Sequence, residues 1–220
     1  MNNKITFIVS SESHPINAFI SEWIHLNKEH DAKIIRSPKE AKGGDICFLI
    51  SCTEIVSKEI IQMYRYCLVI HASDLPLGRG WSPHIWNILN NENEITVSLL
   101  EASEKVDTGR IWKKLKYKIE KYFLYEEIIS IVNKAHLELI DYAVNNQENI
   151  QPMEQDSNIK PTYFPKRTPE HSEIFIDRTL KEQFNLLRVC DNKRFPAFFK
   201  IHGHKYKILI EKYDDKKNED

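Results

Sequence analysis

The feature that most constrains the fold is a set of short, continuous apolar runs separated by helical segments. The clearest runs are Asp45–Ser51 and Cys67–His71, both too short for a typical helix. Strands that are apolar at consecutive positions are usually covered by helices on both faces, as in parallel sheets. Pro15–His30, by contrast, places its apolar residues near helical spacing. The sequence therefore predicts an α/β fold with a mostly parallel, Rossmann-like sheet flanked by helices and right-handed crossovers.

The remaining expected elements continue this alternation. Further strands are expected at Lys4–Ser10, Ala32–Arg36, Ile95–Leu100 and, as a half-exposed edge strand, Arg110–Ile119. Further helices are expected at Ile55–Tyr64, His84–Asn90 and Tyr125–Asn146, the last with an apolar stripe along its length. We expect residues 1–146 to form the catalytic domain.

The composition changes after the long helix. Residues 147–162 are mostly polar and predict a surface connection. Residues 163–212 are expected to form a small C-terminal subdomain, with a helix at Asp177–Val189 capped by Asp177 and a hairpin of Phe195–His202 and Tyr206–Ile210. Residues 213–220 are charged and are expected to fray. The fold class is therefore α/β with a small helix and β-hairpin appendage.

Charge and targeting signals narrow the function classes. The net charge is −1 over 220 residues, so no overall field favours nucleic acid or anionic lipid. The apolar run near the N-terminus is too short for a signal peptide or a membrane span, and the four cysteines form no Cys-x-x-Cys pair. We expect a cytoplasmic protein with reduced thiols and no metal site, nucleic-acid partner or membrane partner.

One histidine occupies a position at which open α/β sheets usually carry their active sites. His71 ends an apolar strand and is followed by a loop that contains Pro76, Gly78 and Gly80. Ligands of open α/β sheets bind outside the carboxyl ends of the strands. Asp107, in a later loop, offers this histidine an acidic partner.

The motifs around both residues resemble those of folate-dependent formyltransferases. The matching segments are His71–Pro76, then Arg79-Gly80, then Val106–Ile111, and the resemblance covers roughly residues 1–125. Tyr163–Glu170 and Pro196–Lys200 resemble the tail of the branch that acts on nucleotide-linked amino sugars, particularly those of the pseudaminic acid type. Their order makes the resemblance more specific than any single motif.

The resemblance implies an N-formyltransferase that uses 10-formyltetrahydrofolate as cosubstrate. It implies transfer to the amino group of a 4-amino-4,6-dideoxy sugar on UDP or dTDP. His71 would be the base, since an imidazole titrates near neutral pH, and Asp107 would hold and charge-balance it. The family usually has an asparagine two residues before the histidine, whereas this chain has Val69, which has no donor for the developing oxyanion.

The resemblance also implies two groups of binding residues. Folate would be held by backbone of the loops that contain Cys52, Thr53 and Ile55, and Ser103, Glu104 and Val106. The nucleotide sugar would approach Ser73, Arg79, Trp81, Lys166 and Arg167. Arginine suits a diphosphate because its guanidinium pairs with two oxygens at once.

Alternative functions remain open. A methionyl-tRNA formyltransferase would be expected to carry a substantial basic C-terminal domain. A folate- or sugar-binding module with little turnover would follow from Val69. The apolar hairpin also suggests a possible homodimer.

Overall fold

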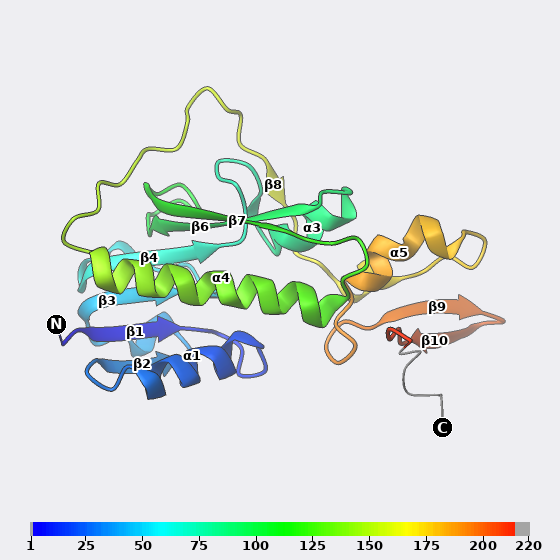
Figure 1. Ribbon diagram of the computed structural model, residues 1–220, viewed down its shortest axis with the longest axis horizontal. Helices are drawn as coiled ribbons and strands as arrows, with labels where there is room; N and C mark the ends of the chain where they lie inside the picture. The colour runs from blue at the N-terminus through cyan, green and yellow to red at the C-terminus, as the bar shows by residue number, and fades with distance from the viewer. Residues whose placement is uncertain (1, 214–220) are drawn as a thin grey trace.

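The structure, a computed structural model, describes residues 2–213 and contains a central six-stranded sheet (Figure 1). Its strands, in the order they occupy across the sheet, are β2 (Asp31–Ile35), β1 (Lys4–Ile8), β3 (Gly44–Leu49), β4 (Tyr64–His71), β6 (Glu94–Glu101) and β7 (Ile111–Lys118). The first four are parallel, while β6 runs antiparallel to β4 and β7 antiparallel to β6. The predicted mostly parallel, Rossmann-like sheet is confirmed.

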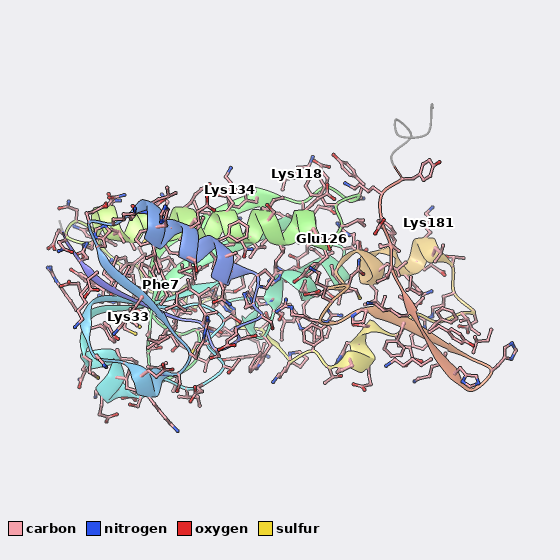
Figure 2. All side chains as sticks on the ribbon, turned by 90° about the horizontal axis from the view of Figure 1, so that it is seen from below. Phe7, Lys33, Lys118, Glu126, Lys134 and Lys181 are labelled. Atoms are coloured by element: carbon pink, nitrogen blue, oxygen red, sulfur yellow. The ribbon has the colours of Figure 1, made fainter. Side chains whose placement is uncertain are left out.

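Helices cover both faces of this sheet. α1 (Ile16–Leu26) and the long α4 (Tyr125–Asn146) pack on one face over the largest apolar cluster, which includes Phe7. α3 (Pro83–Leu89) joins the same cluster, and α2 (Lys58–Gln62) packs on the opposite face. Figure 2 shows Phe7 inside the body, whereas Lys118 and Lys134 point outward. Within residues 2–213, no helix has both the length and the apolar character needed to cross a bilayer.

The predicted elements agree with the structure best where their apolar pattern is longest. α4 begins and ends at the predicted residues, Tyr125 and Asn146. The expected helix Ile55–Tyr64 is shorter, because the chain stays in a loop up to the N-cap Ser57 and Tyr64 already pairs with Gly44 in the sheet. The strand that leads to His71 is correspondingly longer than expected.

The C-terminal part contains the predicted helix and hairpin (Figure 1). These are α5 (Leu180–Arg188) and the antiparallel strands β9 (Ala197–Ile201) and β10 (His204–Ile208). The predicted cap of the helix was wrong: Thr179, not Asp177, is the N-cap, because Thr179 forms a reciprocal capping box with Glu182. Of the predicted frayed end, residues 214–220 lie outside the part of the chain that the structure describes.

Two short strands link this C-terminal part to the loop after β4. β5 (Arg79–Gly80) pairs in parallel with β8 (Tyr163–Phe164), and short 3-10 helices occur at Pro38–Glu40 and Pro169–Ser172. Figure 1 shows the chain leaving α4 and running along the β6–β7 side of the sheet to reach β8. The polar connection thus returns to the carboxyl end of β4.

Candidate active site

His71 occupies the last position of β4 and is buried. Side chains alternate along a strand, so His71 lies on the same face as Val69 and Cys67, away from α1 and α4. The imidazole Nε2 lies 2.9 Å from the carbonyl oxygen of Gly78 and 3.6 Å from Oδ2 of Asp107. A carbonyl oxygen only accepts, so this geometry assigns the hydrogen to Nε2 and leaves the lone pair on Nδ1.

Asp107 is held at both its backbone and its side chain. Its backbone has φ 56°, in the left-handed region, which aspartate tolerates better than most residues. The amide of Gly80 donates a 2.9 Å hydrogen bond to Oδ2, the same oxygen that faces His71. Two residues on, Gly109 lies so close to β6 that a Cβ atom there would be 1.8 Å from the carbonyl oxygen of Glu101. The loop conformation therefore aims the carboxylate at His71.

A segment from the polar connection covers this loop; we call residues 153–164 the strap. Met153 forms an antiparallel bridge with Ile111 at the start of β7. Further along, Thr162 accepts two backbone hydrogen bonds, from the amide of Gly78 to its Oγ1 at 2.8 Å and from the amide of Arg79 to its carbonyl at 2.9 Å. The strap is therefore bonded to the start of β7 and to the loop after β4.

Arg79 belongs to this strap contact rather than to open solvent. Its side chain is buried, and its guanidinium donates to Oε1 of Gln155 at 2.7 Å and to the hydroxyl of Tyr163 at 3.1 Å. Its Nε is buried without a hydrogen-bond partner among the described residues. The guanidinium of Arg79 therefore bonds to the strap and holds it against the loop after β4.

Val69, Cys52 and Ala102 form an apolar shelf on the face of the sheet that also carries His71. These three side chains come from β4 and from the loops after β3 and β6, and all pack against one apolar cluster. Burial raises the pKa of the Cys52 thiol, whose Sγ–H donates to the carbonyl of Glu54 at 3.4 Å. All four cysteines are free thiols. The shelf is therefore apolar and carries no charged side chain.

The residues predicted to bind folate lie on two loops that border this shelf. An ion pair of 3.7 Å joins Glu104 in the second loop to Lys58, the first residue of α2, which follows the first loop. Each presents an apolar side chain to solvent: Ile55 is 81% exposed and Val106 is 58% exposed. Other residues stabilise the loops: the amide of Thr53 donates to Ser10, and the hydroxyl of Ser103 donates to the carbonyl of Lys105.

Among the residues predicted to bind the acceptor, Trp81 and Lys166 form a pair, whereas Arg167 and Ser73 have separate surroundings. Trp81 and Lys166 come together across the β5–β8 pair, with the ammonium 4.8 Å from the ring centroid and the indole 38% exposed. Arg167 instead donates to the carbonyl of His171 at 3.1 Å. Ser73 is buried, with its hydroxyl unpaired among the described residues.

Three other histidines gather near the carboxyl ends of the strands. Burial, followed by the charges of neighbours that include Arg194, lowers the pKa of His14 to about 4. Burial also lowers the pKa of His136 to about 4 and, together with the neighbouring histidines and Arg167, that of His84 to about 3. Nδ1–H of His136 donates to the carbonyl of Val132 at 2.6 Å. All three imidazoles are therefore neutral near neutral pH.

Sequence reasoning did not find two bonding residues of the strap, Gln155 and Thr162. Gln155 and Thr162 stand in a polar stretch without apolar period, where nothing local distinguishes them from solvent-exposed side chains. The only available signal was the position of Thr162 directly before Tyr163, where the resemblance to the family tail begins.

The fold and the site together define a Rossmann-like α/β protein with a His–Asp pair at the carboxyl end of a central strand. Residues 5–140 match the family model described as Formyl transferase, and the chain belongs to that family. Relatives include the methionyl-tRNA formyltransferases of Caldicellulosiruptor saccharolyticus, 27% identical over 182 residues, and of Rickettsia felis, 33% identical over 133 residues. These alignments cover 79% and 60% of this chain but only 57% and 44% of the relatives, so the chain spans about half their length.

Solved structures share the fold over nearly the whole chain. A methionyl-tRNA formyltransferase from Clostridium thermocellum has a TM-score of 0.81 at 23% identity, covering 96% of this chain and 94% of that one. A 4-N formyltransferase from Francisella tularensis has a TM-score of 0.76 at 16% identity, covering 96% and 98%. HypX from Aquifex aeolicus, in complex with tetrahydrofolic acid, has a TM-score of 0.74 at 20% identity, covering 93% and 37%. The predicted resemblance is confirmed for the family, and the sugar branch stays a prediction.

Proposed function

We propose that this chain transfers a formyl group from 10-formyltetrahydrofolate to a primary amine, with His71 as the base and Asp107 as its partner. The observation that carries the proposal is the 3.6 Å approach of two buried side chains, Asp107 Oδ2 and His71 Nε2, at the end of β4 in a formyl transferase family chain. A buried carboxylate against an imidazole at this edge of a sheet is a typical arrangement for acid–base chemistry.

The chemistry follows from these two groups. The acceptor amine attacks the formyl carbon, and a C–N bond forms while the carbonyl oxygen takes up negative charge. Nδ1 of His71 accepts the amine proton, and the carboxylate of Asp107 stabilises the imidazolium that results. The bond from the formyl carbon to N10 of the folate then breaks, and N10 receives the proton. The products are the formamide and tetrahydrofolate.

The oxyanion needs a donor other than residue 69. Val69 is in contact with the apolar residues Leu75, Leu100 and Ile111 and has no polar side-chain atom. In this proposal the imidazolium of His71, once formed, supplies the positive charge that stabilises the oxyanion. Loss of one preorganised donor typically lowers a rate by about 10²–10³-fold, so we expect slow turnover.

The two loops beside the shelf suit a flat, partly apolar cosubstrate. Ile55 and Val106 are exposed on the loops that carry Cys52 and Ala102, and their burial by a bound ring system would be favourable. The pterin edge carries donors and acceptors that loop backbone groups can pair with. We therefore assign folate to the loops that contain Cys52, Thr53 and Ile55, and Ser103, Glu104 and Val106.

For the acceptor we propose a 4-amino-4,6-dideoxy sugar linked to UDP or dTDP. Trp81 directly follows Gly80, whose amide holds Asp107, and it offers an exposed ring beside the ammonium of Lys166. An aromatic face next to a cation suits a nucleoside diphosphate, since the base stacks and the phosphates pair with the charge.

A second candidate acceptor is the methionyl group of an aminoacylated tRNA. The named methionyl-tRNA formyltransferases among the relatives favour it. Its chemistry at His71 would be the same, because the acceptor is again a primary amine. The two candidates differ only in what lies beyond that amine.

The test is a mass assay with 10-formyltetrahydrofolate. UDP- and dTDP-linked amino sugars and methionyl-tRNA are each incubated with the protein and scanned for the gain of one CO. Gain on an amino sugar, abolished in His71→Ala, supports the main proposal, and gain on methionyl-tRNA alone selects the second candidate. Binding of folate with no gain on either acceptor would instead support a binding module with little turnover.

A further inference from the structure

Gln155 commits its side-chain amide to the loop that carries Asp107 and to Arg79 in β5. Its Nε2 donates to the carbonyl oxygen of Asp107 at 2.8 Å and to that of Gly109 at 3.0 Å. Its Oε1 accepts from Nη2 of Arg79 at 2.7 Å. An amide has two N–H donors, so both are committed to the two carbonyls that flank the turn at Thr108.

Arg79 fixes which way this amide points. A guanidinium only donates, so the oxygen of Gln155 must face Arg79 and the nitrogen must face the carbonyls of Asp107 and Gly109. The hydroxyl of Tyr163 accepts another guanidinium hydrogen of Arg79, at 3.1 Å. The strap thus supplies an oriented donor pair to the Asp107 loop.

The left-handed backbone of Asp107 needs contacts from outside its own loop to stabilise it. A residue other than glycine in the left-handed region is strained and persists only where its surroundings impose that conformation. Gly80 bonds the carboxylate of Asp107. The backbone of the turn is held from outside by Gln155, whose bonds set the direction from which the side chain leaves the loop.

We propose that Gln155 is a positioning residue for formyl transfer, which locks the backbone of Asp107 and Gly109 and so keeps the Asp107 carboxylate against His71. The inference rests on the proposed function for its kinetic consequence. Its structural consequence, the position of the carboxylate, is measurable without any turnover.

Two substitutions separate positioning from a general effect on the strap. Gln155→Leu removes both donors and the acceptor at similar size. Gln155→Glu keeps an acceptor for Arg79 but turns an oxygen toward the two carbonyls, so the strap contact survives while the hold on Asp107 is lost. The matched control is Gln151→Leu, because Gln151 is exposed and makes no hydrogen bond within residues 2–213.

The first readout is amide hydrogen exchange by NMR. The amide of Gly80 reports the Asp107 carboxylate, whereas the amides of Arg79 and Trp81 donate to Thr162 and Phe164 and report the strap. In both Gln155 variants we expect exchange at Gly80 to accelerate about tenfold or more, with Arg79 and Trp81 still protected. Unchanged protection of Gly80 would overturn the proposal. Loss of protection at all three amides would also overturn it, because Gln155 would then hold the whole strap in place rather than the Asp107 carboxylate.

The second readout is the division between kcat and KM. Displacement of a catalytic group by about 1 Å can cost about 10²-fold, so we expect kcat to fall ten- to hundredfold in both variants with KM for folate unchanged. Wild-type kinetics in Gln155→Glu would overturn the proposal, as would an equal loss in Gln151→Leu. If the wild-type protein formylates neither acceptor, the proposed function fails, and the Gly80 exchange then decides alone whether Gln155 positions the carboxylate.

Discussion

The carboxylate of Asp107 faces the imidazole of His71 at 3.6 Å, and the same oxygen accepts a 2.9 Å hydrogen bond from the amide of Gly80. Both side chains are buried. Since Gly80 follows Arg79 in β5, the carboxylate joins the histidine at the end of β4 to the β5–β8 pair. A single carboxylate oxygen therefore links the proposed base to the C-terminal segment.

Asp107→Asn should separate the charge of this carboxylate from its structural role. Asparagine tolerates the left-handed backbone and keeps an oxygen for the amide of Gly80, but it cannot stabilise an imidazolium by charge. We expect kcat for formyl transfer to fall about 10²–10⁴-fold with little change in melting temperature. Kinetics and a thermal melt of the same preparation measure both.

The control for this change is Asp156→Asn. Asp156 stands in the strap and its carboxylate accepts hydrogen bonds only from Asn158 among the described residues. The Asp156→Asn variant should retain full activity. Near-normal turnover in Asp107→Asn would remove Asp107 from the mechanism.

Val69→Asn tests whether the missing side-chain donor limits the rate. Asparagine would place an amide two residues before His71, where the resemblance expects it, at the expense of a polar group beside Leu75, Leu100 and Ile111. We expect kcat to rise, by up to about 10²-fold, and the free energy of unfolding to fall by about 1–3 kcal/mol. Turnover and urea denaturation are the measurements.

Val69→Thr is the matched control for polarity, since it keeps the shape of valine and exchanges one methyl group for a hydroxyl, without an amide. It should lose stability without gaining rate. A folded but inactive Val69→Asn would mean that the pocket has been rebuilt around valine.

Long periodic elements were predictable from the sequence, whereas contacts made by aperiodic segments were not. The helix Tyr125–Asn146 carries an apolar stripe over its full length, and both ends were correct. The predicted approach of His71 and Asp107 came from motif order, because local pattern does not relate residues so far apart in the chain. The structure places them together.

The strap could not be predicted for a physical reason. Gln155 and Thr162 act through hydrogen bonds to backbone atoms of distant loops, and no periodicity marks such bonds in a polar stretch. The strands β5 and β8 have two residues each, too few to show alternation. The cap at Thr179, by contrast, had a signal in Glu182 three residues later.

Val106→Ser tests the folate assignment. Val106 is 58% exposed on one of the two loops beside the shelf, so its removal should cost little stability in the free protein. If folate covers it, the variant loses apolar contact in the complex, and we expect KM for 10-formyltetrahydrofolate to rise about three- to thirtyfold with kcat unchanged. Titration with tetrahydrofolate gives the same answer without turnover.

Leu26→Ser is the control, since Leu26 is 72% exposed at the end of α1, away from the carboxyl ends of the strands. It should leave both kinetic constants unchanged. An equal KM for Val106→Ser and wild type would place the folate elsewhere.

Stability should fall on mild acidification because of three histidines, of which His136 is buried and His14 and His84 are half-buried. The folded-state pKa of His14 and of His136 is about 4 and that of His84 about 3, all lowered chiefly by burial from the ordinary histidine value of 6.5. Below pH 6.5 the unfolded chain therefore binds protons that the folded chain does not. The stabilisation is complete above pH 6.5 and is lost as pH falls toward the folded values, with a slope that approaches about 1.4 kcal/mol per pH unit for each histidine.

Urea denaturation between pH 7.5 and 5.5 measures this slope in a window above the range where most carboxylates titrate. His84→Asn removes one titrating group, whose Nδ1 is buried without a partner among the described residues, so we expect the slope to fall by about a third. The comparison is between slopes, since the substitution also changes stability at every pH. A free energy of unfolding that stays constant across this window would show that the three imidazoles reach solvent and titrate alike in both states.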